Sequence, residues 1–154
     1  MDQKFSRRSV LGYVAGGAAG GVLLASSAPI KAAPMKFKAD MNGASEVPPT
    51  QTSGTGTVTA TYDPATKTLT WEGNFSGLTG PATAAHFHGP AEADKNAAPV
   101  IWISEKGKNL TSPFKGSATL TDAQADELQK RLWYANVHTD ANKGGEIRGQ
   151  VVKA

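Results

Sequence analysis

Apolar and polar residues alternate along most of the chain after residue 35, the pattern of strands with one buried face. In the stretch from Thr57 to Tyr62, for example, threonines alternate with Val58, Ala60 and Tyr62. Turn-forming residues, such as Pro64, separate the alternating stretches. We expect eight short strands, at residues 35–41, 54–62, 68–75, 82–88, 99–104, 114–120, 134–139 and 146–152.

One stretch has helical spacing instead. Thr121 and Gln124 form a capping-box pattern, and apolar residues follow at helical intervals up to Trp133. This predicts a single short helix near residues 122–132. Eight short strands and one helix indicate an all-β fold, an antiparallel Greek-key β-sandwich or barrel.

The chain has only three histidines, and two of them are one residue apart. In a strand, His86 and His88 point to one face and Phe87 to the other. His138 lies in another alternating stretch, 134–139, and can add a third imidazole from a strand distant in sequence. Because the chain has no cysteine, a transition metal held by strong ligands would depend on these three residues.

The N-terminal segment has the features of an export signal. Arg7 and Arg8 precede a Gly/Ala-rich apolar run that ends near Ala25, which is typical of a twin-arginine (Tat) signal. The run is shorter than the roughly 18 residues of a membrane-spanning helix, which disfavours the alternative of a retained anchor. We expect a signal peptide at 1–33, a mature domain at 34–154, no membrane attachment after cleavage, and a periplasmic or secreted location.

Removing that segment changes the charge balance. Residues 1–33 hold four of the 16 basic residues and one of the 13 acidic residues, so the remainder is formally neutral. A neutral domain without a basic patch is not expected to bind nucleic acid. Its length of about 120 residues suits one domain with one core.

Two blocks of sequence resemble the CHRD domain, first named from chordin. The first is Ala85-His86-Phe87-His88-Gly89-Pro90-Ala91; the second runs from Tyr134 to Thr139 and continues with Gly144-Gly145-Glu146-Ile147-Arg148-Gly149-Gln150. The resemblance covers residues 36–152. It implies an extracellular or exported protein but says little about activity.

The His-x-His pair with a late histidine is also similar to the copper ligands of copper/zinc superoxide dismutases, which hold copper on a Greek-key sandwich. The fold expected here is superoxide dismutase-like or immunoglobulin-like. The similarity implies that Arg148 guides a small anion such as superoxide to the metal. The chain departs from that family because it has no bridging histidine, no visible set of zinc ligands and no disulfide. The similarity therefore implies only a mononuclear copper site in this chain.

Imidazoles suit several metals; copper is favoured by affinity order, and zinc is the alternative. Asn136 and Asp140 are candidates to hydrogen-bond the outer nitrogens of the ligands. Three functions stay open: a copper enzyme like superoxide dismutase, a periplasmic copper carrier or buffer, and a structural or ligand-binding module without metal.

Overall fold

The computed structural model describes residues 32–154. The predicted twin-arginine signal lies outside these residues. No helix in the described part of the chain is long and apolar enough to cross a membrane.

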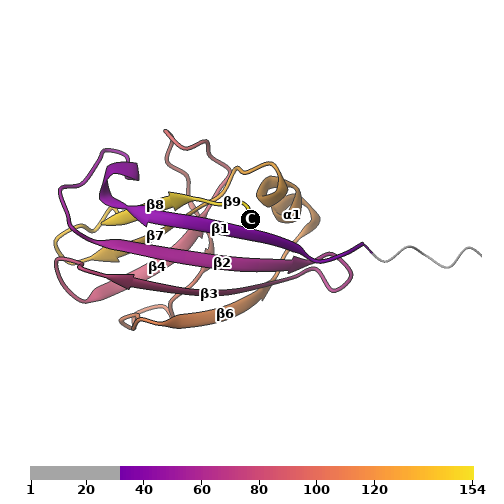
Figure 1. Cartoon of the computed structure of the whole chain (residues 1–154), viewed down its shortest axis with the longest axis horizontal. Helices are drawn as coiled ribbons and strands as arrows, with labels where there is room; N and C mark the ends of the chain where they lie inside the picture. Colours follow the sequence, from indigo (N-terminus) through magenta and orange to yellow (C-terminus); the bar gives the residue numbers. More distant parts are fainter. Residues whose placement is uncertain (1–31) are drawn as a thin grey trace, which may run out of the picture. The chain divides into compact units, whose positions relative to one another are not determined.

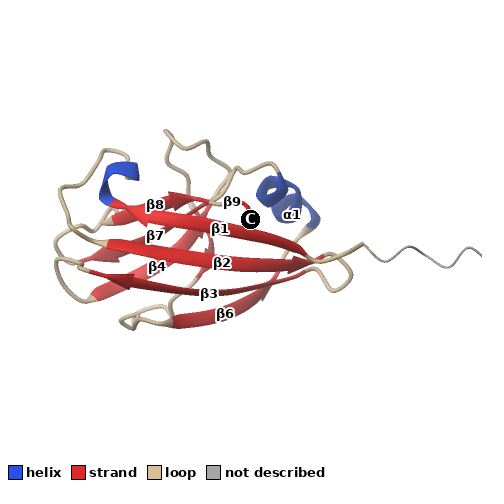
Figure 2. Ribbon diagram, viewed as in Figure 1, coloured by secondary structure: helices blue, strands red, loops and turns tan. Residues whose placement is uncertain are grey.

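The described residues form nine strands, one α-helix and one short 3₁₀ helix (Figures 1 and 2). The strands are β1 (Met35–Asn42), β2 (Thr55–Asp63), β3 (Thr68–Ser76), β4 (Ala82–His88), β5 (Pro99–Trp102), β6 (Phe114–Thr119), β7 (Tyr134–Thr139), β8 (Ile147–Gln150) and β9 (Val152–Lys153). The helices are η1 (Gly43–Ser45) and α1 (Asp122–Gln129). A strand is present at each predicted position, but the last predicted strand, 146–152, is divided at Val151 into β8 and β9.

The strands form one antiparallel sheet in the order β5-β4-β7-β8-β1-β2-β3-β6, with β9 also paired to β1. The sheet curls on itself, so that β1, β2, β3 and β6 lie in front of β4, β7 and β8 in Figure 1. The predicted all-β antiparallel fold with one short helix is confirmed, as a nearly closed barrel.

Alternating side chains from both halves of the sheet fill the interior. Trp71 of β3 meets Phe87 of β4 edge to face, with ring centroids 5.4 Å apart, and Phe87 also packs near Trp133. Aromatic pairs in this geometry add to the stability from apolar burial. Phe87 therefore connects the two halves of the barrel through the core.

Helix α1 starts as predicted and ends earlier than predicted. Thr121 and Gln124 form the complete capping box. Arg131 then takes a left-handed conformation (φ 62°), and the amides of Arg131 and Leu132 bond to the carbonyls of Leu128 and Glu127. This is a Schellman ending, and it turns Trp133 into the core instead of continuing the helix.

Candidate metal centre

The strand register places the three histidines on the outer face of β4 and β7. His86 pairs with Asn136, and Ala84 pairs with His138. On the other side of β7, Asn136 pairs with Arg148 of β8. Because residues two apart share a face, the outer face of these three strands carries the histidines, Asn136 and Arg148, while Phe87 points inward as predicted.

The three imidazoles converge, as the sequence predicts. One ring nitrogen from each of His86, His88 and His138 lies within 4.8 Å of the other two. His86 Nδ1 is 3.1 Å from His138 Nε2, and the rings of His86 and His88 are nearly perpendicular. Two strands thus bring His138 next to residues 50 and 52 positions earlier in the chain, at a separation that one metal ion could bridge.

Backbone carbonyls contact the Nδ1 atoms of two of the rings and orient them. His138 Nδ1 lies 3.0 Å from the carbonyl oxygen of Lys143, and His88 Nδ1 lies 2.9 Å from that of Ala97. A carbonyl only accepts hydrogen bonds, so a ring nitrogen that bonds to it carries the proton. In this tautomer the Nε2 atom of each ring keeps its lone pair, which is the form that binds metal. That atom lies 3.1 Å from His86 Nδ1 in His138 and 3.0 Å from Asn136 Oδ1 in His88.

The remaining ring contacts fit a metal site and leave a metal-free site incompletely satisfied. His86 Nε2 is buried without a hydrogen-bond partner among the described residues. His88 lies between two acceptors, Ala97 O and Asn136 Oδ1, the latter 3.0 Å from its Nε2, and a neutral ring can donate to only one of them. A cation bound at His88 Nε2 would remove the conflict between these two acceptors, and His86 lies beside His138 Nε2 with its Nδ1, not with the unpartnered Nε2.

Burial keeps the rings neutral. It lowers the pKa of His86 to about 4, with further lowering from His138 and His88. Burial also lowers the pKa of His88 and His138, although hydrogen bonds to Ala97 and Lys143 oppose it. His86 and His88 are each 6% exposed, whereas His138 is partly exposed and lies where the site is open to solvent.

Of the two predicted outer partners, the structure brings Asn136 to the histidines. Its side-chain oxygen faces His88 Nε2, so Asn136 contacts His88 and not its strand neighbour His138. Asp140 lies exposed in the turn after β7. Lys143 O occupies the position beside His138 Nδ1 that Asp140 was expected to take.

Arg148 is buried and bonded to the loop at residues 90–98. Its guanidinium donates to Asn96 Oδ1, to Lys95 O and to Glu92 O, at 2.9, 2.6 and 3.3 Å. The same loop supplies Ala97 O to His88. In the structure Arg148 therefore anchors a loop that orients a candidate ligand, and its role as an anion guide stays a prediction.

Tyr134 links Arg148 to the histidines. His88 stacks on its ring, with centroids 4.7 Å apart and planes 5° apart, and the Arg148 guanidinium carbon lies 3.4 Å from the ring centroid. Because β4 and β8 flank β7 on opposite sides, His88 and Arg148 cover opposite faces of the ring. Cation–π contact and stacking thus hold His88 in place.

Two neighbours of the site were not predicted from the sequence. Trp102 of β5, 44% exposed, lies edge-on to His86 with centroids 4.2 Å apart. Glu46 is buried near Asn136 and Arg148, both of which affect its pKa. Glu46 lies in a proline-containing loop far from both histidine blocks, and only the fold brings it to the site.

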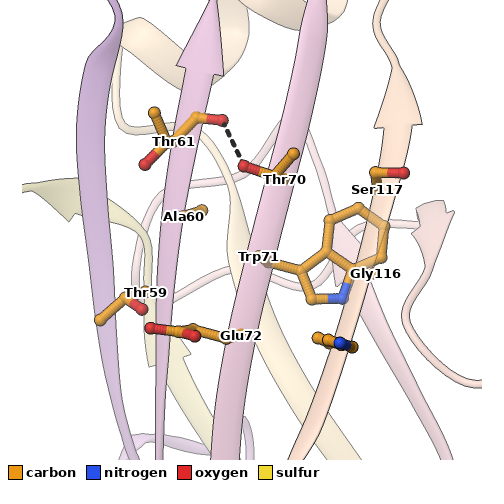
Figure 3. A pocket seen from close by; sticks show the side chains of 9 residues that line it. Thr59, Ala60, Thr61, Thr70, Trp71, Glu72, Gly116 and Ser117 are labelled. Carbon is orange, nitrogen blue, oxygen red and sulfur yellow. Dashed lines mark hydrogen bonds between the residues drawn. The ribbon is translucent and has the colours of Figure 1, made fainter.

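A hollow of about 590 Å³ lies on the other half of the sheet, over β2, β3 and β6 (Figure 3). Thr59, Thr61, Thr70 and Glu72 line it, and the indole of Trp71 lies beside Gly116. It shares no lining residue with the histidine cluster. The hollow and the candidate metal ligands are therefore separate features.

Comparison with known proteins gives one match. The family model of the CHRD domain matches residues 37–151, which include all three histidines. No curated protein and no solved structure matches the chain. The similarity of the histidines to the copper ligands of superoxide dismutases stays a prediction.

Proposed function

This chain belongs to the CHRD domain family, and we propose that it binds one copper ion through His86, His88 and His138. The observation that carries the proposal is the convergence of three ring nitrogens within 4.8 Å. Carbonyl partners on the far side of His88 and His138 support it, because they hold the Nε2 lone pairs toward the cluster. Such partners normally increase the metal affinity of histidine ligands.

Copper is proposed because the donor set consists of neutral imidazoles. Among the common divalent metals, a site of this kind binds copper most tightly, and zinc is the competing candidate. Bound copper would supply one-electron redox chemistry. The protein would supply the three nitrogens and the surrounding loops that keep the rings neutral.

Among the copper functions, we favour a carrier or buffer over an enzyme. The Arg148 guanidinium makes three hydrogen bonds to the 90–98 loop, which favours an anchoring role over a role in attracting superoxide. We also propose export by the twin-arginine route, from Arg7 and Arg8, so that the site would operate in the periplasm or outside the cell.

Copper(II) titration of metal-free protein tests the proposal. Wild type should bind one copper per chain, and each of His86→Ala, His88→Ala and His138→Ala should weaken binding by at least about 100-fold. Asp140→Asn is the matched control and should bind like wild type, because Lys143 O orients His138. Equal, weak binding by wild type and the triple His→Ala variant would overturn the proposal and leave a metal-free module.

Two further measurements assign the metal and the activity. Zinc should be displaced by equimolar copper, and a site that retains zinc would assign zinc instead. A superoxide dismutation assay of the copper-loaded protein should show no activity above that of free copper. Activity in wild type that is lost in Arg148→Lys, with copper still bound, would indicate an enzyme instead of a carrier.

A further inference from the structure

Glu46 and Asn136 meet at Gly145, beside the candidate metal centre. A Cβ on Gly145 would lie 2.3 Å from Glu46 Oε1 and 2.7 Å from Asn136 Nδ2. The backbone at Gly145 also has φ 132°, which disfavours any residue but glycine. Gly145, the second glycine of the Gly-Gly-Glu motif, therefore leaves room for a carboxyl group next to the Asn136 amide.

Asn136 connects this carboxyl group to a candidate ligand. Its Nδ2 is on the side of Glu46, and its Oδ1 lies 3.0 Å from His88 Nε2. Glu46 is 5% exposed, and its Oε1 has no hydrogen-bond partner within residues 32–154. A buried carboxyl oxygen without a hydrogen-bond partner costs free energy. A small movement that lets the Asn136 amide donate to Glu46 Oε1 is therefore favoured.

We infer that Glu46 is a positioning residue of the metal centre, which sets whether Asn136 turns its oxygen or its amide hydrogens toward His88. The inference rests on the proposed metal-binding function. An Asn side chain can exchange its oxygen and nitrogen by a half-turn, and the hydrogen-bond partners at both ends decide which orientation is stable.

The carboxylate form of Glu46 holds the orientation seen in the structure. A carboxylate only accepts hydrogen bonds, so it attracts the Asn136 NH₂ group and repels Oδ1. Oδ1 then faces His88 Nε2 and offers it no proton, and when Ala97 O holds the ring proton on Nδ1 the Nε2 lone pair accepts no hydrogen bond. The lone pair stays available to a metal ion.

The neutral form of Glu46 permits the opposite orientation. A protonated carboxyl group can donate to Oδ1, and after the half-turn the Asn136 NH₂ group can donate to His88 Nε2. Both ends are then hydrogen-bonded, but the lone pair of His88 is occupied. A metal ion must displace that hydrogen bond, so the site binds metal less tightly.

The two forms of Glu46 interconvert in an accessible pH range. Burial raises the pKa of Glu46 to about 7, although Arg148, the Val47 amide and Asn136 lower it. Glu46 lines a second pocket, separate from the hollow over β2, β3 and β6, and the other charged residues that line it are Arg148 from β8 and Asp94 from the 90–98 loop. The residue of β7 next to Glu46 is the uncharged Asn136. Metal affinity should therefore rise as pH increases through about 7.

The first test uses metal-free protein. The side-chain amide resonances of Asn136, followed by NMR from pH 5.5 to 8.5, should show a step centred near pH 7. Glu46→Gln, which has the same size but does not ionise, should remove the step, and Asp94→Asn should keep it. An unchanged step in Glu46→Gln, or no step in wild type, would overturn the inference.

The second test compares copper(II) affinity at pH 5.5 and pH 8. Wild type and Glu46→Gln should bind alike at pH 5.5, and Glu46→Gln should bind about 10-fold more weakly at pH 8, the usual size of an outer-partner effect. If wild type and Glu46→Gln bind copper(II) with equal affinity at pH 8 as well as at pH 5.5, the role of Glu46 is contradicted. Failure of wild type to bind copper would instead contradict the proposed function. The pH-dependent step in the Asn136 amide resonances would still test whether Glu46 orients Asn136.

Discussion

The two faces of the β4–β7–β8 half of the sheet are both largely buried, yet they have opposite chemistry. The inner face carries Phe87, Ala135 and Val137, each at most 1% exposed, and is covered by the other half of the barrel. The outer face carries the histidines, Asn136 and Arg148 and is covered by loops. Alternation in sequence thus separates two buried environments here, whereas it usually separates core from solvent.

The difference follows from what covers each face. Apolar contacts on the inner face have no required direction, so packing alone satisfies them. Every polar atom on the outer face needs a partner, and the loops supply carbonyls to His88, His138 and Arg148. The His86 nitrogen next to another candidate ligand is Nδ1, 3.1 Å from His138 Nε2, so the space between the converging rings is where a metal ion can bind.

The largest expected effect is on the inner face. Phe87→Ala removes the ring that contacts Trp71 and Trp133, and it should lower the free energy of unfolding by about 3–5 kcal/mol. His86→Ala, one position away on the outer face, should cost less than half as much in metal-free protein, because its ring has an unpartnered nitrogen. Urea unfolding measures both. Equal losses would mean that the two faces contribute alike to stability.

The sequence allowed prediction of the inner face better than of the outer one. Alternation identifies the strands and the side of each residue, and it places Phe87 inside and His86 with His88 outside. The partners of the histidines are mostly main-chain carbonyls, at Ala97 and Lys143, and every residue type carries one. No side-chain pattern could therefore distinguish Lys143 from the neighbouring Asp140.

Two other features depended on the three-dimensional structure. The helix was expected to reach residue 132, but the left-handed conformation at Arg131 ends it, and arginine gives no signal for such an ending. Glu46 reaches the site because η1 and the following loop fold against β8 and because Gly145 leaves room. The Gly-Gly-Glu motif was visible in the sequence, but its packing role was not.

A smaller effect is expected from Glu146, a fully buried carboxyl group next to Thr139. Glu146 accepts hydrogen bonds from Thr52, Thr79 and Thr139, the last of which shares the inner face with Val137. Burial raises its pKa, but these hydrogen bonds outweigh burial and lower it to about 2. Glu146→Gln should cost about 1–3 kcal/mol at pH 7, as expected for hydrogen bonds to a charged group.

The pH dependence of that loss has a definite sign. The folded pKa of Glu146 lies below the ordinary value of 4.5, so its stabilising contribution is present above pH 4.5 and is lost as pH falls toward 2. Thermal unfolding between pH 2 and pH 6 should therefore show the difference between wild type and Glu146→Gln shrinking at low pH. A constant difference would show that the carboxylate charge is not what the threonines stabilise.

The smallest effect on stability is expected at Trp102, which lies at the outer edge of the histidine cluster. Its ring is 44% exposed and contacts His86 edge-on, so Trp102→Phe should change the free energy of unfolding by no more than about 0.5 kcal/mol. Trp71 and Trp133 lie in the core on the inner side. Copper(II) quenches nearby indoles most strongly, so Trp102→Phe should remove more than half of the fluorescence quenching that copper causes in wild type. If quenching in that variant keeps its full amplitude, copper binds nearer the core tryptophans than the histidine cluster allows, and the assignment of chemistry to the outer face alone is wrong.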